Sequence, residues 1–445
     1  MFFTIQSVEK IQCVTMETKT FFWYFRPIAL ICKVLGIFPL QNLRTSNPAE
    51  LRAPIRSFAH LYSFAIFGFN IYMIWFFSGF MFAIQNSFYL FIVVYVMIFR
   101  SIFCFVFCAS HSKKLPKLIL LLDLFDRKKR PILVDQSSYC FRSLFTWTLL
   151  PVVVGAVAIA LSFYESANVV LETMPPELSV LHTNLSAVFF GSLGTWQVAP
   201  LLLYIYFASR IACNYRILNK TIKRQFHGSF LSEVKYSDES RATLEYLRQM
   251  HNLLTKAVEE MGKCYGNFMA IDQFCLIVMV IANICTFIND RTHEIHLLAI
   301  TVFNFLVVVW VLVISNEIKE AGNKVIYVLR AIVLSRVDDP TRIEVSQSLH
   351  TTFFLQFFQI QTFMMQIAAQ PVEVSAAGYF IIDKRQIPSV LSSIATYLVV
   401  SLQFIQEGES ELAIKKIFLQ TIVFRTRKHH KLHLCLTLFC IILCY

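Results

Sequence analysis

The sequence lacks the short motifs that carry enzymatic chemistry. It contains no phosphate-binding glycine loop, no His-Glu-x-x-His zinc motif and no Gly-x-Ser-x-Gly nucleophile elbow. Its twelve cysteines show neither Cys-x-x-Cys spacing nor a His/Cys ligand pattern, and most lie inside apolar runs. We therefore predict no catalytic activity, no cofactor, no metal site and no disulfide framework, with the cysteines acting as small core residues.

The sequence also has too few polar residues for an ordinary soluble domain. Hydrophobic residues make up 56% of the chain and Phe alone accounts for 44 of 445 positions, whereas a soluble domain is about 45–50% apolar. A polytopic, all-α membrane protein is the class that this composition favours. The net charge of +12 comes from Lys and Arg residues placed between apolar runs. That pattern indicates orientation in a bilayer and argues against a nucleic-acid partner.

Seven apolar runs are predicted to be membrane spans. They cover residues 61–84, 88–108, 145–163, 185–208, 268–287, 297–315 and 387–404. The stretch 21–40 is also apolar, but Arg26, Pro27 and Lys33 interrupt it. We expect it to form an interfacial or re-entrant segment of the N-terminal region 1–60.

Lys and Arg residues set the predicted orientation. They concentrate in 1–60, 109–144, 209–267 and 316–386, while the alternate connections carry almost none. Because basic loops stay in the cytoplasm, we place the N-terminus inside and the end of the seventh span outside. Asn184 begins a glycosylation sequon that would then lie on an outer connection.

A family resemblance rests on the C-terminal part of the chain. Thr396 and Tyr397, five largely apolar residues, and then Gln403 and Phe404 follow an upstream Gly-x-Phe-x-x-Asp at 378–383. The chain resembles the insect gustatory receptor family over about residues 25–406, because that family ends with a TYhhhhhQF signature in its last helix. The resemblance implies seven helices inverted relative to G-protein-coupled receptors, whose DRY and NPxxY motifs are absent here. It also implies a homotetrameric, ligand-gated cation channel in the plasma membrane of gustatory receptor neurons.

The final helix is the predicted pore lining. Its polar and aromatic residues recur at helical spacing and share neighbouring faces, a pattern that also fits a helix-packing surface. In the family the Gln-Phe pair lies at the gate, so the resemblance implies a gate at Gln403 and Phe404. The implied lining or supporting residues are Thr396, Tyr397, Val400 and Ser401.

The resemblance also implies a cytoplasmic anchor where four subunits meet, here 316–386 together with helical stretches in 209–267. Solvated loop helices are the alternative reading of these segments. The family places its tastant pocket within each subunit, in the outer half of the membrane. Each candidate pocket residue could equally be ordinary packing. The candidates are Tyr95, Phe163, Tyr164, Trp196, Gln197, Asn283 and Asn304.

The ligand class is predicted less sharply. Aromatic side chains with a few amides suit a small, flat, partly polar molecule. Sugar receptors of the family commonly carry Glu after Thr-Tyr, whereas this chain has Leu398. We therefore expect a bitter or deterrent compound, with a fructose-type sensor as the second choice. The alternatives to a homomeric channel are a heteromer with other gustatory receptors, a non-conducting co-receptor subunit and a membrane transporter.

Two features stand apart from the resemblance. Arg100 lies near the middle of the second span, and Asp272 in the fifth is the one carboxylate available inside a span. A structural ion pair, a ligand or gating role, and an interface-facing Arg are all open interpretations. The tail 405–445 carries basic residues on the predicted outer side, against the charge rule. We expect either a gene-model artefact or a membrane-associated tail.

Overall fold

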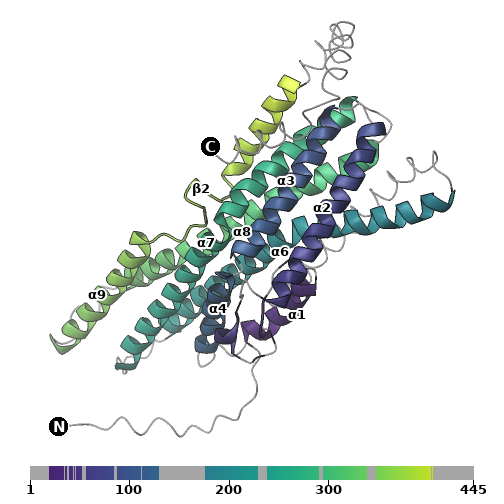
Figure 1. Cartoon of the computed structure of the whole chain (residues 1–445). Helices are drawn as coiled ribbons and strands as arrows, with labels where there is room; N and C mark the ends of the chain where they lie inside the picture. Colours follow the sequence, from purple (N-terminus) through teal and green to yellow (C-terminus); the bar gives the residue numbers. More distant parts are fainter. Residues whose placement is uncertain are drawn as a thin grey trace. The chain divides into compact units, whose positions relative to one another are not determined.

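A computed structural model describes residues 20–34, 36–37, 40–43, 45, 47–52, 57–84, 88–111, 113–129, 176–228, 238–289, 294–337, 347–401 and 403. Within these residues the chain is helical except for one short hairpin, turns and an isolated bridge (Figure 1). The helical character expected from the sequence is thus confirmed. The chain divides into two compact units, Met1–Pro388 and Ser389–Tyr445.

Three long helices form the centre of the first unit. They are α6 (Pro176–Gly228), α7 (Asp238–Asn289) and α8 (Glu294–Val337), and each packs against the other two. At about 1.5 Å per residue they extend about 65–80 Å, more than twice the roughly 30 Å of a bilayer core. The runs 185–208, 268–287 and 297–315 lie inside these helices, which continue through much of the connecting segments 209–267 and 316–386, where helical stretches were expected.

Length and hydropathy identify fewer spans than the sequence predicts. Within the described residues, Ala242–Thr286 and Thr301–Val333 are each long and apolar enough to cross a membrane. Tyr95–His111 and Leu115–Lys129, bent by 62° relative to each other, would add a third if they form one span. The run 145–163 and the tail 405–445 lie outside the described residues. The count of seven spans therefore stays a prediction.

Helices α2 (Phe58–Ile84) and α3 (Phe88–His111) occupy the first two apolar runs. α3 packs along α7, where the Phe107 and Phe268 rings stack with centroids 4.6 Å apart. Cys104 and Cys108 are buried free thiols on α3, as expected for core cysteines. Cys213 of α6 differs, because it is disulfide-bonded; the spacing of cysteines along the sequence gave no sign of this.

The N-terminal helix α1 (Phe21–Val34) packs on α4 (Leu115–Lys129). Its buried face is entirely apolar except for a thiol, and Phe25 lies 5.4 Å from the Phe207 ring of α6. The backbone N–H of Phe22 donates to Asp123 Oδ1 at 3.2 Å. At about 1.5 Å per residue, 14 residues are too short to span a bilayer. The helix therefore packs on the bundle at α4 and near the middle of α6.

The chain between α8 and the last helix folds into two further elements. α9 (Gln347–Ala369) packs against α8 and α7. An antiparallel hairpin follows, with β1 (Ser375–Ala376) paired to β2 (Phe380–Ile381) in the register Ser375 to Ile381 and Ala376 to Phe380. The sequence reading missed this hairpin. The last described helix is Gln386–Ser401.

Candidate functional site

The Gly-x-Phe-x-x-Asp motif builds the entry to the last helix. Ala377 and Gly378 take left-handed backbone angles, with φ of 54° and 87°, and close the hairpin turn. Phe380 pairs with Ala376 on the opposite strand. Asp383 then caps the helix, because its Oδ1 accepts the backbone N–H of Arg385 at 2.9 Å. Each motif residue thus has a backbone role in placing the helix start.

The candidate pore residues lie mostly on the open surface of this helix in the single chain. Tyr397 is 60% exposed and Val400 40%, Thr396 and Gln403 are exposed, and Ser401 is half-buried. The Thr396 hydroxyl donates to the Ser392 carbonyl at 2.9 Å. Phe404 lies outside the described residues. The exposed groups provide a hydroxyl, an amide and a phenol at helical spacing, which is a set able to line a water path.

Arg100 and Asp272, the pair suggested by the sequence, join α3 to α7. Arg100 Nε lies 2.5 Å from Asp272 Oδ1, and the two side chains are 3% and 0% exposed. The second carboxylate oxygen of Asp272 has no hydrogen-bond partner within the described part of the chain. A charge-assisted bond at this burial fixes the two helices relative to each other.

Two of the candidate ligand residues are buried amides with unused hydrogen-bonding capacity. Asn283, 1% exposed near the end of α7, has no partner for either amide atom among the described residues. Asn304, 6% exposed near the start of α8, has none for Nδ2 there. Because α7 and α8 end and begin on adjoining sequence and pack together, both amides belong to the same end of the bundle. Buried amides normally find partners, so within the described part of the chain these two stand out as polar groups with hydrogen-bonding capacity left over.

The other candidates are less well placed. Tyr95 on α3 is 48% exposed. Trp196 and Gln197 lie on α6, but their side chains are outside the described set, as are Phe163 and Tyr164 altogether.

Asn184 requires a correction, because it lies inside α6 rather than on a connection. Pro176 suits the first turn of a helix, so α6 begins well before the apolar run that marked its start in the sequence.

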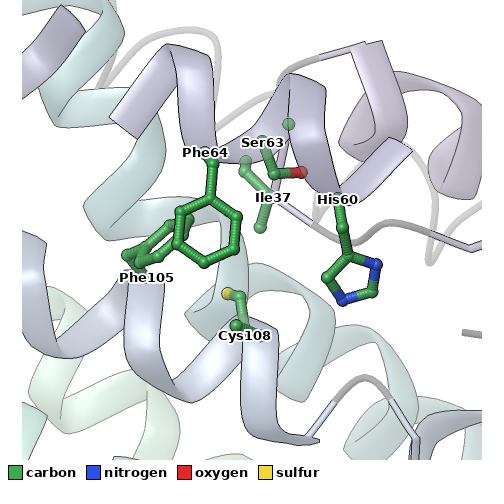
Figure 2. A pocket seen from close by; sticks show the side chains of 8 residues that line it. Ile37, His60, Ser63, Phe64, Phe105 and Cys108 are labelled. Atoms are coloured by element: carbon green, nitrogen blue, oxygen red, sulfur yellow. The ribbon is translucent and has the colours of Figure 1, made fainter. Parts of the chain in front are cut away.

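A small pocket lies where the start of α2 meets the end of α3 (Figure 2). Its cavity volume is about 10 Å³, between the start of α2, the end of α3 and the segment after α1. His60 and Ser63 supply polar groups, and Phe64, Phe105 and Cys108 supply the apolar wall. No residue of this pocket was a candidate from the sequence. Its volume is below the roughly 300–1,000 Å³ of most ligand sites, so the amides near the other end remain the stronger candidates.

A buried charged cluster lies on α4 and α6. Arg210 Nη2 donates to Asp126 Oδ2 at 2.6 Å. Lys129 is 5% exposed and its Nζ has no hydrogen-bond partner among the residues described. Burial, and then the positive Arg210, lower the pKa of Lys129 to about 8. The cluster ties α4, and α1 through it, to the bundle.

One family model and two solved structures are similar to this chain. A family model described as 7tm Chemosensory receptor matches residues 25–408. The insect olfactory receptor OR5 from Machilis hrabei in complex with eugenol has a similar fold, with a TM-score of 0.61 at 17% identity, covering 85% of this chain and 97% of that one. A second structure of OR5 gives a TM-score of 0.59 at 16% identity with the same coverage. No curated protein matches.

Proposed function

Because the chain belongs to the insect 7tm chemosensory receptor family, we propose that it is a gustatory receptor that opens a cation channel when a small molecule binds. Members of the family are ligand-gated cation channels, and the family is a membrane-protein family. The support for a gustatory rather than an olfactory receptor is the signature formed by Thr396, Tyr397, Gln403 and Phe404. The OR5 structures, at 16–17% identity, support only the fold.

The observation that carries the channel proposal is that the last helix, exposed over most of its surface in the single chain, carries polar side chains among its exposed apolar ones. Thr396, Tyr397 and Gln403 would be costly on a surface facing lipid, yet they are exposed in the single chain. Around a four-fold axis in a homotetramer, or in a heteromer with related receptors, the same face lines a central path. Gln403 amides then replace part of an ion's hydration shell, and Phe404 rings form the constriction that closes it. Monovalent and divalent cations are the proposed permeants.

The ligand proposal rests on Asn283 and Asn304. Two buried amides without partners can each exchange hydrogen bonds with a partly polar molecule while the surrounding helices cover its apolar parts. With the N-terminus cytoplasmic, this end of the bundle is the outer half of the plasma membrane. Leu398 in place of Glu favours a bitter or deterrent compound over a sugar, and fructose is the second candidate. The cell type that this assigns is the gustatory receptor neuron.

Whole-cell recording tests the proposal. The full chain, and a chain ending at residue 406, would be expressed and exposed to quinine, eugenol and fructose; eugenol is included because the OR5 structure holds it. We expect an evoked, non-selective cation current. Phe404→Ala should raise the current in the absence of compound, because a methyl group in place of the phenyl ring leaves the constriction wider. Phe358→Ala, at an exposed site on α9, is the control.

The outcomes separate the alternatives. Coupled uptake of a solute without passive current would indicate a transporter. Silence of the tetramer at the cell surface, relieved only by co-expression with a second receptor, would indicate a co-receptor subunit. An evoked current unchanged by Phe404→Ala and by Gln403→Ala would remove the gate from the last helix.

A further inference from the structure

The hairpin before the last helix is seated on α7 at two glycines. Gly262 and Gly266 are one turn apart, so they lie on the same face. A Cβ on Gly266 would come within 2.5 Å of the Ala377 backbone nitrogen and 2.9 Å of the Ser375 carbonyl oxygen. A Cβ on Gly262 would lie 3.6 Å from the same carbonyl oxygen. The backbone of β1 therefore rests directly on the backbone of α7, in a space that admits only hydrogen at position 266.

A third glycine seats the hairpin on α8. A Cβ on Gly322 would meet Val372 Cβ at 2.8 Å, and Val372 is 1% exposed. Val374 and Ala376 are buried as well, at 1% and 0%. Interfaces packed this closely leave no space for one side to slide independently of the other. A shift of either α7 or α8 must therefore carry the hairpin with it.

Lys319 of α8 holds both ends of the hairpin. Its Nζ lies 2.7 Å from Glu373 Oε1, before β1, and 3.4 Å from Asp383 Oδ2, after β2. The Lys319 side chain is only 16% exposed. Asp383 is the residue whose other oxygen caps the last helix. One ammonium group on α8 thus contacts the carboxylate that fixes the start of that helix.

A second contact repeats this link beside the first. Lys384 Nζ lies 2.5 Å from Glu320 Oε1, which also accepts from Asn316 Nδ2 at 2.8 Å. Both Glu320 and Asn316 are on α8. The division of the chain into two units falls at Pro388 and Ser389, so the hairpin and the first helical turn are what joins the last helix covalently to the bundle.

From these contacts we infer that the hairpin from Val372 to Asp383 is the coupling element that passes movements of α7 and α8 to the last helix. Lys319 is its positioning residue, and Gly266 and Gly322 are its seats. The inference rests on the proposed function, because the movement it transmits is the one that opens the channel. A ligand held at the far ends of α7 and α8 acts on the gate by moving the helices on which the hairpin is clamped.

The first test needs no ligand. Hydrogen–deuterium exchange of the purified full-length protein compares Lys319→Met with the parent. Loss of the ammonium group frees Asp383, so we expect backbone amides at 385–393 to exchange roughly tenfold faster, as for a lost hydrogen bond to a charged group. Lys319→Arg should restore the parent rate, since a guanidinium reaches both carboxylates. Lys324→Met, at an exposed lysine of the same helix, is the control.

The second test uses the glycine seats and the current. Gly266→Ala should lower the maximal current evoked by quinine, eugenol or fructose roughly tenfold, about what a 1.4 kcal/mol change in the opening equilibrium gives. The half-maximal concentration should change less. Gly68→Ala is the matched control, because a Cβ on Gly68 meets nothing within 4 Å. Lys319→Met, which keeps the seats intact, should reduce the current in the same way.

The outcomes are separable. Unchanged exchange at 385–393 in Lys319→Met would overturn the coupling element, whatever the currents show. Faster exchange with parent-like currents in both variants would overturn its role in opening. A parent chain that conducts with none of the three compounds would count against the proposed function, while the exchange data would still decide whether α8 holds the last helix.

Discussion

Breaking the ion pair between Arg100 and Asp272 should destabilise the bundle strongly. Asp272→Asn keeps the shape of the side chain but leaves the Arg100 guanidinium, 3% exposed, without its carboxylate. Removing one partner of a buried pair costs about 3–5 kcal/mol, because a charge remains where water cannot solvate it. Arg100→Met combined with Asp272→Leu removes both charges. That double variant should lie within about 1–2 kcal/mol of the parent, or above it.

The measurement is the temperature at which half of the assembled protein is lost on heating, with one fixed scan rate for all variants so that irreversible loss does not distort the comparison. Glu317→Gln is the matched control. Its partner Arg216 lies 2.7 Å away, but the two side chains are 55% and 37% exposed, so breaking the pair should cost at most about 1 kcal/mol. A double variant as unstable as the two single changes combined would show that the charges are not coupled, and would refute the reasoning.

Three further predictions follow from other buried groups. Asn283→Leu should raise stability by about 1–3 kcal/mol in a thermal melt, because it removes amide atoms that lack partners, and should abolish the evoked current if the amide binds the ligand. Burial lowers the pKa of His251 to about 4, below its usual 6.5, so the unfolded chain binds the proton more readily. Stability should therefore fall as pH drops from about 6.5 toward 4; a flat profile, or the same slope in His251→Phe, would contradict this. Asp123→Ala should cost about 2–4 kcal/mol and loosen α1, since the carboxylate accepts both the Phe22 N–H and the Arg127 Nε–H; faster exchange of α1 amides is the readout, and an unchanged rate would exclude the contact as its anchor.

Hydrophobic composition and periodicity were enough to predict a helical membrane-type protein, but not where its helices end. Apolar runs of about 20 residues mark the part of a helix that suits lipid. The same helices continue as α6, α7 and α8 through polar sequence, since Leu244 and Leu247 keep a buried face at helical spacing. Hydropathy therefore locates candidate spans and says little about helix length.

The hairpin escaped prediction for a different reason. Val372, Val374 and Ala376 alternate with more exposed residues, which is a strand pattern, but strands of two residues are too short for periodicity to be decisive. What stabilises them is the fit to Gly266 and Gly322 on distant helices. Arg100 and Asp272 could be paired from the sequence only because a charge inside an apolar run needs a partner and few were on offer. The pocket at His60 could not be predicted from the sequence, because three separate segments of the chain form it.

The helix α7 runs without a break from Asp238 to Asn289. The directions in which its side chains point are therefore fixed relative to one another along the whole helix. Gly266 faces the hairpin and Asp272 faces Arg100 of α3, and at about 100° per residue these two directions lie about 120° apart around the helix. Inserting or deleting a single residue between Gly266 and Asp272 would turn the residues on one side of that point by about 100° relative to those on the other side. One of the two groups would lose its contacts, whatever the new side chain. Substitutions along α7 can therefore be absorbed locally, whereas a change of length cannot.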